Sequence, residues 1–416
     1  MTKTDITQKA RDSAYYVSAF VKWTFFSLIM GSIGGGVGAL FSHLISYVTK
    51  VRTENEWLIY LLPLGGVAIA LLYHLLKVEH KGTNDVFEAV RSEEKVPCRL
   101  APAIAIGAGI THLLGGSAGK EGAALQLGGS VATLVGRIFR TDEKDRHILT
   151  VSGMAAVFAA VFGTPVGAAV FSVEVVSVGY MSLSALYPAF MSALVAYLVL
   201  LRLGVHPERF DVGAVPEMTV ETLGKVVIAA VIVAVVSIVF CLAMKYSHKA
   251  FDKYIRNPYI RAAVGGVAVI AMTLLVGTKD YNGSGLHIIE GIFHGEEVSR
   301  WAFLLKIIFT AVTIGSGFKG GEIVPTLFIG ATLGFTMADA VGLPVAFCAA
   351  IGMTALFGSV TNCPIATVFI ALELFGGEGM IFYALAVFVS FVLSGYFSLY
   401  TGQKIVFSKI KEETRE

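Results

Sequence analysis

Two glycine-rich segments of the chain each place a glutamate at the start of an apolar run, Glu121 within residues 115–123 and Glu322 within residues 315–325. Small residues leave backbone N–H groups accessible, and the positive N-terminus of the helix predicted after each segment points toward them. Together these groups form a site for an anion. A glutamate there occupies the site when ionised and leaves it when protonated, so the pattern predicts a proton-linked gate at Glu121.

The second segment repeats the design of the first, and two such helix starts can converge on one site at the membrane midplane. A third candidate is the polar turn at residues 81–86, whose Thr83 hydroxyl and Asn84 amide can donate to an anion. Simpler roles stay open, with the glutamates stabilising helix starts and the polar turn serving as an N-cap. The predicted anion-binding residues of these segments are Thr83, Asn84, Gly119, Lys120, Gly122, Gly320, Gly321, Ile323 and Val324.

The composition places these segments in a membrane. Of 416 residues, 55% are hydrophobic and 15% are charged, against roughly 25% charged in a soluble domain, and the mean hydropathy is +0.74. Several uncharged stretches reach the ~20 residues that a helical span needs, and Pro or Gly pairs interrupt some of them. We therefore expect an all-α polytopic membrane protein in contact with lipid, with ten or more spanning or half-spanning helices, several of them broken.

Charge and cysteine content exclude other classes of site. The formal net charge is +2, which implies no basic surface for nucleic acid. The four cysteines lie far apart without the spacing of metal ligands. We therefore expect no nucleic-acid partner, no metal and no cofactor.

An internal repeat organises the chain. Residues 153–158 align with residues 352–357 at an offset of 199, and Pro165 and Glu174 match Pro364 and Glu373 at that offset. Duplicated halves are typical of transporters. The matched positions of the two glutamates favour a shared structural role, such as binding a neighbouring backbone amide.

The repeat and the polar stretches predict the domain boundaries. We expect a cytoplasmic amphipathic segment at residues 1–16, transmembrane repeats at 17–203 and 223–412, a linker at 204–222, and no soluble regulatory domain. Positive charges gather at both ends and at residues 137–146. By the positive-inside rule these regions are cytoplasmic, which predicts a multi-pass cell-membrane protein with both termini in the cytoplasm.

The ordered motifs resemble those of the CLC family of anion channels and proton-coupled anion antiporters over nearly the whole chain. Residues 119–122 resemble its G-K/R-E-G-P motif, residues 320–325 its G-x-F-x-P region, and residues 81–86 occupy the place of its G-S-G-x-P motif. Residues 401–408 resemble the segment that brings a pore-lining Tyr to the anion, with Phe407 in the place of that Tyr. The resemblance implies two inverted repeats with broken helices meeting at the midplane, a homodimer with one pathway in each protomer, and Glu121 as the gating glutamate.

Two departures from the family pattern bear on the substrate. Glu174 is followed by Val175, where chloride/proton antiporters carry a second, inner proton glutamate. Glu322 places a carboxyl where the family usually has an apolar residue, which resembles the fluoride/proton antiporter branch and implies a second proton-linked group. Against that branch, Thr83 stands where Met is common and Phe407 lacks the Tyr hydroxyl. The resemblance therefore favours fluoride/proton antiport, with chloride/proton antiport and a passive chloride channel as alternatives.

An enzyme of another class is a further alternative, because the segment 315–317 is similar to that of an intramembrane serine protease. The serine of such an enzyme needs a His base. All nine histidines precede Ser316, which excludes a dyad with a later His, and we expect no enzymatic activity.

Overall fold

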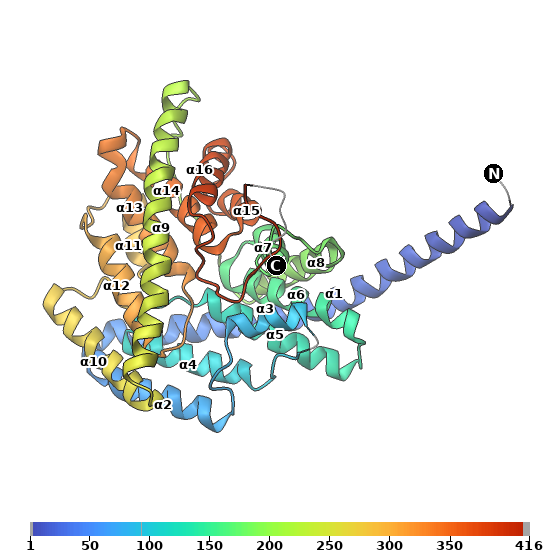
Figure 1. The fold of residues 1–416 in the computed structure, drawn as a ribbon, viewed down its shortest axis with the longest axis horizontal. Helices are drawn as coiled ribbons and strands as arrows, with labels where there is room; N and C mark the ends of the chain where they lie inside the picture. The colour runs from blue at the N-terminus through green and yellow to red at the C-terminus, as the bar shows by residue number, and fades with distance from the viewer. Residues whose placement is uncertain (1–2, 93, 411–416) are drawn as a thin grey trace.

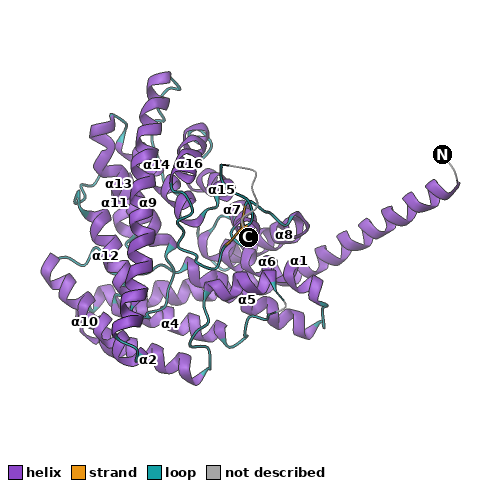
Figure 2. Cartoon of the chain, in the orientation of Figure 1, coloured by secondary structure: helices purple, strands orange, loops and turns teal. Residues whose placement is uncertain are grey.

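The computed structural model describes residues 3–92 and 94–410, which form a helical protein with almost no sheet (Figure 1, Figure 2). The helices of the first half are α1 (Lys3–Glu54), α2 (Leu62–Leu75), α3 (Thr83–Arg91), α4 (Leu100–Leu114), α5 (Glu121–Ile138), α6 (Glu143–Phe162), α7 (Pro165–Glu174) and α8 (Leu186–Arg202). The helices of the second half are α9 (Val220–Tyr254), α10 (Pro258–Val276), α11 (Leu286–Phe293), α12 (Ala302–Gly315), α13 (Ile323–Val341), α14 (Val345–Thr361), α15 (Pro364–Phe375) and α16 (Met380–Leu393). Two 3₁₀ turns, η1 (Glu56–Leu61) and η2 (Leu183–Ala185), and a parallel pair of two-residue strands, β1 (Ser177–Val178) and β2 (Lys404–Ile405), complete the described elements.

The two halves carry the same succession of eight α-helices, so each helix of the first has a counterpart in the second. Counterparts also pack against one another, α2 against α10, α5 against α13 and α7 against α15. Such self-pairing is what an approximate twofold axis between the halves produces. The predicted duplication is therefore visible in the packing as well as in the sequence.

The predicted helix breaks at Pro165 and Pro364 are present, whereas Pro325 lies within the first turn of α13. Between α6 and α7 the chain turns at Gly163 (φ 80°), and Pro165 is the first residue of α7. The matching turn between α14 and α15 uses Asn362 (φ 55°) ahead of Pro364. Asparagine is among the few residues other than glycine that adopt this left-handed conformation readily, and proline is favoured at the first helical position.

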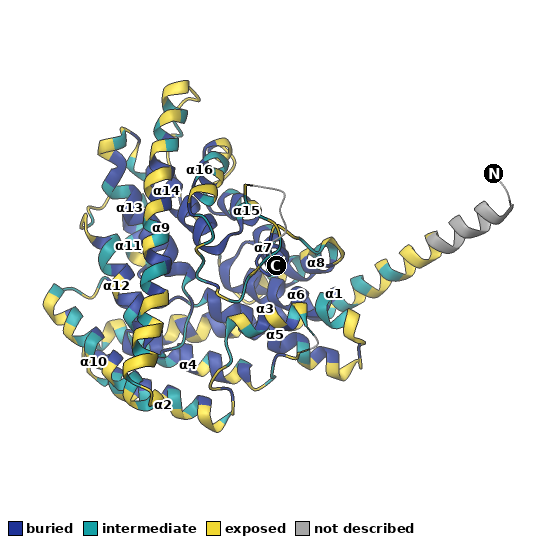
Figure 3. Ribbon diagram, viewed as in Figure 1, coloured by how far each residue is buried: buried dark blue, intermediate teal, exposed yellow. Residues whose placement is uncertain are grey.

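The lengths and burial of the helices fit a membrane protein. Seven helical segments are long and apolar enough to cross a membrane, and six shorter apolar helices of 10–17 residues accompany them among the described residues. The most deeply buried helices are α6 and α14, with α5 and α13 beside them, whereas α9 and the part of α1 from residue 13 onward show exposed residues along their length (Figure 3). The pathway segments predicted above therefore lie in the interior.

The N-terminal segment differs in one respect from the expectation. Helix α1 runs without a break from Lys3 through residues 16 and 17 to Glu54, so residues 3–16 are not a separate element. A surface location for this segment stays a prediction, and Met1 and Thr2 lie outside the described residues. The predicted linker corresponds to the irregular stretch between α8 and α9, and residues 411–412 of the predicted second repeat are also outside the described part.

Candidate anion site

Both glycine-rich segments lead directly into a buried helix. Helix α4 ends at Leu114, the left-handed conformation of Gly115 (φ 85°) then turns the chain, and α5 begins at Glu121. In the second half α12 ends at Gly315, and Glu322 immediately precedes α13. Both glutamates therefore stand where the unpaired N–H groups of a helix start are found.

The two segments meet through their backbones. The N–H groups of Gly119 and Gly321 each donate to the other's carbonyl oxygen, and both N···O distances are 2.7 Å. A Cβ built on Gly321 would lie 2.3 Å from the backbone nitrogen of Gly122, so only glycine allows this approach. The structure thus brings together the predicted stretches 119–122 and 320–324.

Glu121 lines one cavity, which we call the Glu121 cavity. Its side chain is 2% exposed, and its Oε2 accepts a hydrogen bond from the Lys120 N–H at 3.0 Å. The cavity has a volume of about 530 Å³ and is lined in part by Val324. Its charged and titratable lining residues are Lys50, Arg52, His112, Lys120, Glu121, Glu208, His287 and Glu290.

Glu322 lines a second cavity of about 460 Å³, which we call the Glu322 cavity. Lys319 and Gly320 line it as well, and the Lys319 Nζ lies 4.4 Å from the centre of the Tyr73 ring. Arg261 adds a further cation to the lining. Sequence reasoning did not assign Lys319 or Arg261 to the site, although Lys319 is a charge in the motif itself.

Different parts of the chain line the two cavities. The Glu121 cavity is lined by Phe210, ten residues before α9 begins. The Glu322 cavity is lined by residues 241–252 near the far end of the same helix. No residue lines both cavities, so they are separate spaces. One carboxyl group therefore faces each of two cavities, and the paired glycines lie between the carboxyls.

Thr83 is oriented as a donor. It is the first residue of α3, lines the Glu322 cavity, and its Oγ1 accepts a hydrogen bond from Gln126 Nε2 at 3.0 Å. Because the oxygen is engaged as an acceptor, the hydroxyl proton is available to an anion. Gln126 is a residue that the sequence analysis missed. Its signal is that of an amide among the otherwise apolar residues 122–129 of α5.

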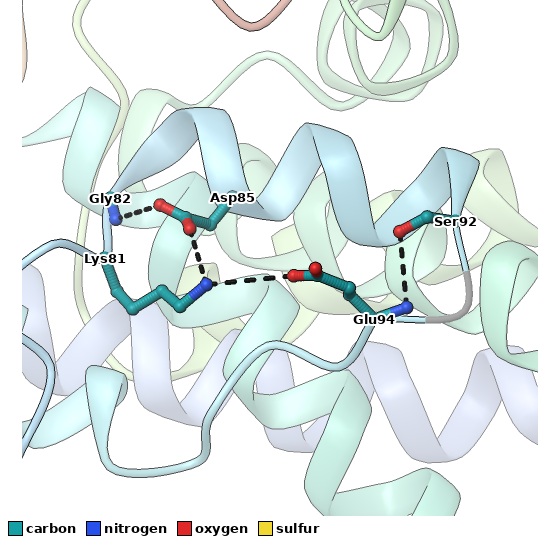
Figure 4. Close-up of polar contacts among 5 residues, drawn as sticks. All are labelled: Lys81, Gly82, Asp85, Ser92 and Glu94. Atoms are coloured by element: carbon teal, nitrogen blue, oxygen red, sulfur yellow. Dashed lines mark hydrogen bonds and ion pairs between the residues drawn. The ribbon is translucent and has the colours of Figure 1, made fainter.

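Asn84 lines the Glu322 cavity, and its amide also binds the C-terminal segment. Its Nδ2 donates to Thr401 Oγ1 at 2.9 Å, and its Oδ1 accepts from the Gly402 N–H at 2.9 Å. The start of α3 is held separately, by Asp85 Oδ2 accepting from the Gly82 N–H at 2.8 Å (Figure 4). The Asn84 amide therefore fastens the C-terminal segment to α3.

Phe407, in contrast, is placed away from the Glu322 cavity. It is 42% exposed, it lies against Gly179, and it does not line the Glu322 cavity. Tyr400 lines that cavity instead and is 3% exposed, and its ring lies edge-to-face with Phe87, the two ring centres being 5.2 Å apart. Its hydroxyl has no hydrogen-bond partner in the described part of the chain. Tyr400 thus supplies the aromatic hydroxyl that the sequence analysis found missing at Phe407.

The expectation for Glu174 and Glu373 is confirmed. The Glu174 carboxylate accepts from the Ile365 and Ala366 N–H groups at 3.1 and 2.7 Å. Glu373 accepts from the N–H groups at the start of α7, those of Val166 at 3.0 Å and Gly167 at 2.8 Å. Each glutamate therefore caps the partner repeat's broken helix, and neither is placed to carry an anion.

The Ser316 hydroxyl is buried and donates to the Thr313 carbonyl oxygen at 3.0 Å. Within residues 3–92 and 94–410 no group of three or more His, Cys, Asp and Glu side chains is arranged to hold a metal.

The protein has two inverted halves, and their glycine-rich helix starts meet between two cavities. This arrangement defines a membrane transport protein. The family model described as voltage gated chloride channel matches residues 65–395. A chloride/fluoride channel protein of Pseudomonas syringae pv. tomato is 34% identical over 396 residues, which are 93% of this chain and 87% of that protein. The chain belongs to this family, the CLC family.

Solved structures confirm the predicted all-α CLC-type fold. A CLC-type fluoride/proton antiporter superposes with a TM-score of 0.90 at 32% identity, covering 93% of this chain and 98% of that one. A slow cyanobacterial Cl⁻/H⁺ antiporter superposes with a TM-score of 0.77 at 19% identity, covering 89% and 94%. An H⁺/Cl⁻ exchange transporter of Vibrio campbellii is 25% identical over 84% of this chain and 81% of its own length.

Proposed function

We propose that the protein exchanges fluoride for protons, with Glu121 as the gate and Glu322 as a second proton-linked group. One observation carries the proposal: two carboxyl groups stand at opposed helix starts, and each faces its own cavity. The 34% identical relative named as a chloride/fluoride channel and the similar fluoride/proton antiporter structure support fluoride as the anion.

The site offers hydrogen-bond donors suited to a small anion. Fluoride is strongly hydrated, so it requires several close donors when it loses its water. Backbone N–H groups at the starts of α5 and α13 supply some, and the Thr83 and Tyr400 hydroxyls supply others. An ionised carboxylate ~4 Å from a bound anion costs about 4 kcal/mol at an effective dielectric constant of 20. Anion arrival therefore drives protonation or displacement of the carboxylate, which couples the two fluxes.

The second candidate is chloride/proton exchange, which is favoured by the relatives named H⁺/Cl⁻ exchange transporters. A chloride channel is the uncoupled form of the same pathway. Chloride accepts longer and weaker donor contacts than fluoride does, and it does not require a carboxyl at residue 322.

The test is transport in liposomes, with fluoride and chloride electrodes and pH recorded together. We expect fluoride efflux to drive proton uptake in the parent protein. Glu121→Gln and Glu322→Gln should each abolish this coupling, because an amide neither takes up nor releases a proton. Glu297→Gln, at an exposed position that lines neither cavity, is the matched control. Chloride/proton exchange without fluoride movement in the parent, unchanged in Glu322→Gln, would overturn the fluoride proposal.

The remaining expectations belong to the same proposal. We infer a homodimer in the cell membrane with both termini in the cytoplasm, so that the Glu322 cavity opens inward and the Glu121 cavity outward. The positive charges at residues 137–146 and at the chain ends support this orientation. Cysteine introduced at Lys249, in the exposed last turns of α9, should react with a membrane-impermeant thiol reagent from the cytoplasmic side.

A further inference from the structure

A third cavity, of about 290 Å³, lies where α3, α5 and α6 end or begin and is separate from both carboxylate cavities. We call it the basic pocket. Its cationic lining consists of Lys95, Arg137, Arg140 and Arg146, with His147 beside them. The proposed exchange of fluoride for protons gives these cations no part in binding either ion.

The basic pocket has an excess of positive charge. Its lining includes two carboxylates, Glu94 and Glu143. Glu94 lies 3.8 Å from the Lys81 Nζ at the start of α3 (Figure 4). Within residues 3–92 and 94–410 no ion pair joins any of the three arginines to a carboxylate. One basic residue is common at the end of a helix, where it complements the dipole, but that effect does not account for four.

Arg140 adopts an unfavourable backbone conformation at this pocket. It has φ 50° and follows the end of α5, where the Thr141 N–H donates to the Gly136 carbonyl oxygen at 3.0 Å. This is the position of a helix end that glycine normally occupies. A side chain in the left-handed conformation costs roughly 1–2 kcal/mol, so the chain keeps an arginine where glycine would be more stable.

The side of α5 next to the pocket is apolar and exposed. Leu134, Ile138 and Phe139 are 48%, 66% and 42% exposed, and the Phe139 ring packs against Phe25, which is 51% exposed. Trp23 lies two residues before Phe25 in α1, under the Lys22 ammonium. Trp and Lys are typical of the membrane–water interface. A molecule in the pocket thus has charge on one side and acyl-chain surroundings on the other.

We propose that the basic pocket binds the phosphate head group of an anionic phospholipid, whose acyl chains lie along the exposed face of α5. An arginine guanidinium can donate two N–H groups to two oxygens of one phosphate. Basic pockets at helix ends also bind the head groups of anionic lipids. The His147 ring is fixed by the hydrogen bond between its Nδ1 and the Val90 carbonyl oxygen, at 2.5 Å, and so forms a rigid wall of the pocket. A free phosphate would use the same cations but not the apolar face.

The experiment uses the full chain, purified in a neutral detergent and depleted of lipid. Phosphatidylglycerol, phosphatidylcholine with the same acyl chains, and inorganic phosphate are titrated separately. Bound lipid is counted by native mass spectrometry, and the thermal midpoint Tm is followed in parallel. We expect phosphatidylglycerol to bind and raise Tm, phosphatidylcholine to do neither, and phosphate to act only at far higher concentration.

Variants assign the binding to the pocket. Arg140→Gly should weaken phosphatidylglycerol binding about fivefold, the effect of one cation near an anionic surface. The same variant should raise Tm in lipid-free detergent, because glycine relieves the backbone cost. This rise distinguishes lost binding from lost folding. Adding Arg137→Gln and Arg146→Gln should weaken binding about 100-fold.

A matched control removes three charges from the exposed end of α9, by Lys249→Gln, Lys253→Gln and Arg256→Gln. This control should bind phosphatidylglycerol as the parent does. Equal binding of both lipids, equal losses in the control and the pocket variants, or a full Tm shift from phosphate at the lipid's concentration would each overturn the proposal.

Discussion

Replacing Gly321 with alanine tests whether the paired backbones of the two repeats build the site. The new Cβ would lie 2.3 Å from the backbone nitrogen of Gly122 and 2.8 Å from its Cα. Because backbone atoms cannot rotate away, the two segments must separate. This separation breaks the two hydrogen bonds between Gly119 and Gly321, whose N···O distances are both 2.7 Å.

The expected cost combines two effects. Each lost hydrogen bond contributes about 1 kcal/mol, and overpacking adds roughly 1–3 kcal/mol. The native arrangement should therefore be destabilised by about 3 to 5 kcal/mol, and donors displaced from the anion should slow transport at least tenfold. Gly36→Ala is the matched control, since a Cβ there meets no atom within 4 Å and alanine favours a helix by about 1 kcal/mol over glycine.

The assay pairs Tm in detergent with fluoride flux in liposomes. We expect Gly321→Ala to lower both, and Gly36→Ala to keep flux and hold or raise Tm. If Gly321→Ala transported at the parent rate with an unchanged Tm, the paired glycines would not be what positions the donors.

Three further predictions follow from the contacts at the site. Tyr400→Phe removes a buried hydroxyl that has no described partner, so Tm should hold or rise while the anion concentration for half-maximal flux increases several-fold; an unchanged value would exclude Tyr400 as a donor. Phe407→Leu should alter that concentration less than twofold, because Phe407 is 42% exposed and lines neither carboxylate cavity; a larger effect would restore the role predicted from the motif. Glu373→Gln replaces one of two carboxylate acceptors at the start of α7 and should cost about 1.5–3 kcal/mol, measured as a lower Tm with fluoride/proton coupling retained; lost coupling in a stable protein would contradict a purely structural role.

The sequence predicts well what the repeat and local backbone chemistry determine. Matched positions in a duplicated chain lie in equivalent surroundings, so the roles inferred for Glu174 and Glu373 follow from their placement after Pro165 and Pro364. The helix breaks can also be predicted, because a proline lacks the N–H group that helical hydrogen bonding needs. Glycine-rich helix starts also reveal themselves locally.

The course of the C-terminal segment is not readable in this way. Its path is set by long-range contacts, namely the bonds of Asn84 to Thr401 and Gly402 and the pairing of β2 with β1. These contacts bring Tyr400 to the Glu322 cavity and leave Phe407 outside it. A motif alignment counts positions along the chain, so it does not detect that the segment is anchored at Thr401 and Gly402, ahead of Phe407. The role of Gln126 was not predicted for a related reason, because its hydrogen-bond partner Thr83 is 43 residues away in the sequence.

The Gly119–Gly321 pairing also has a consequence for biosynthesis. The two glycines are about 200 residues apart in the chain, so at roughly 5–20 residues per second the first segment waits on the order of 10 to 40 s for its partner to be made. During that interval the Gly119 N–H and carbonyl groups lack their final partner within a membrane-embedded segment, where unsatisfied backbone groups are costly. Water or the insertion machinery must hydrogen-bond to these groups until the second repeat has been made. The nascent first repeat is therefore most easily misfolded during this interval.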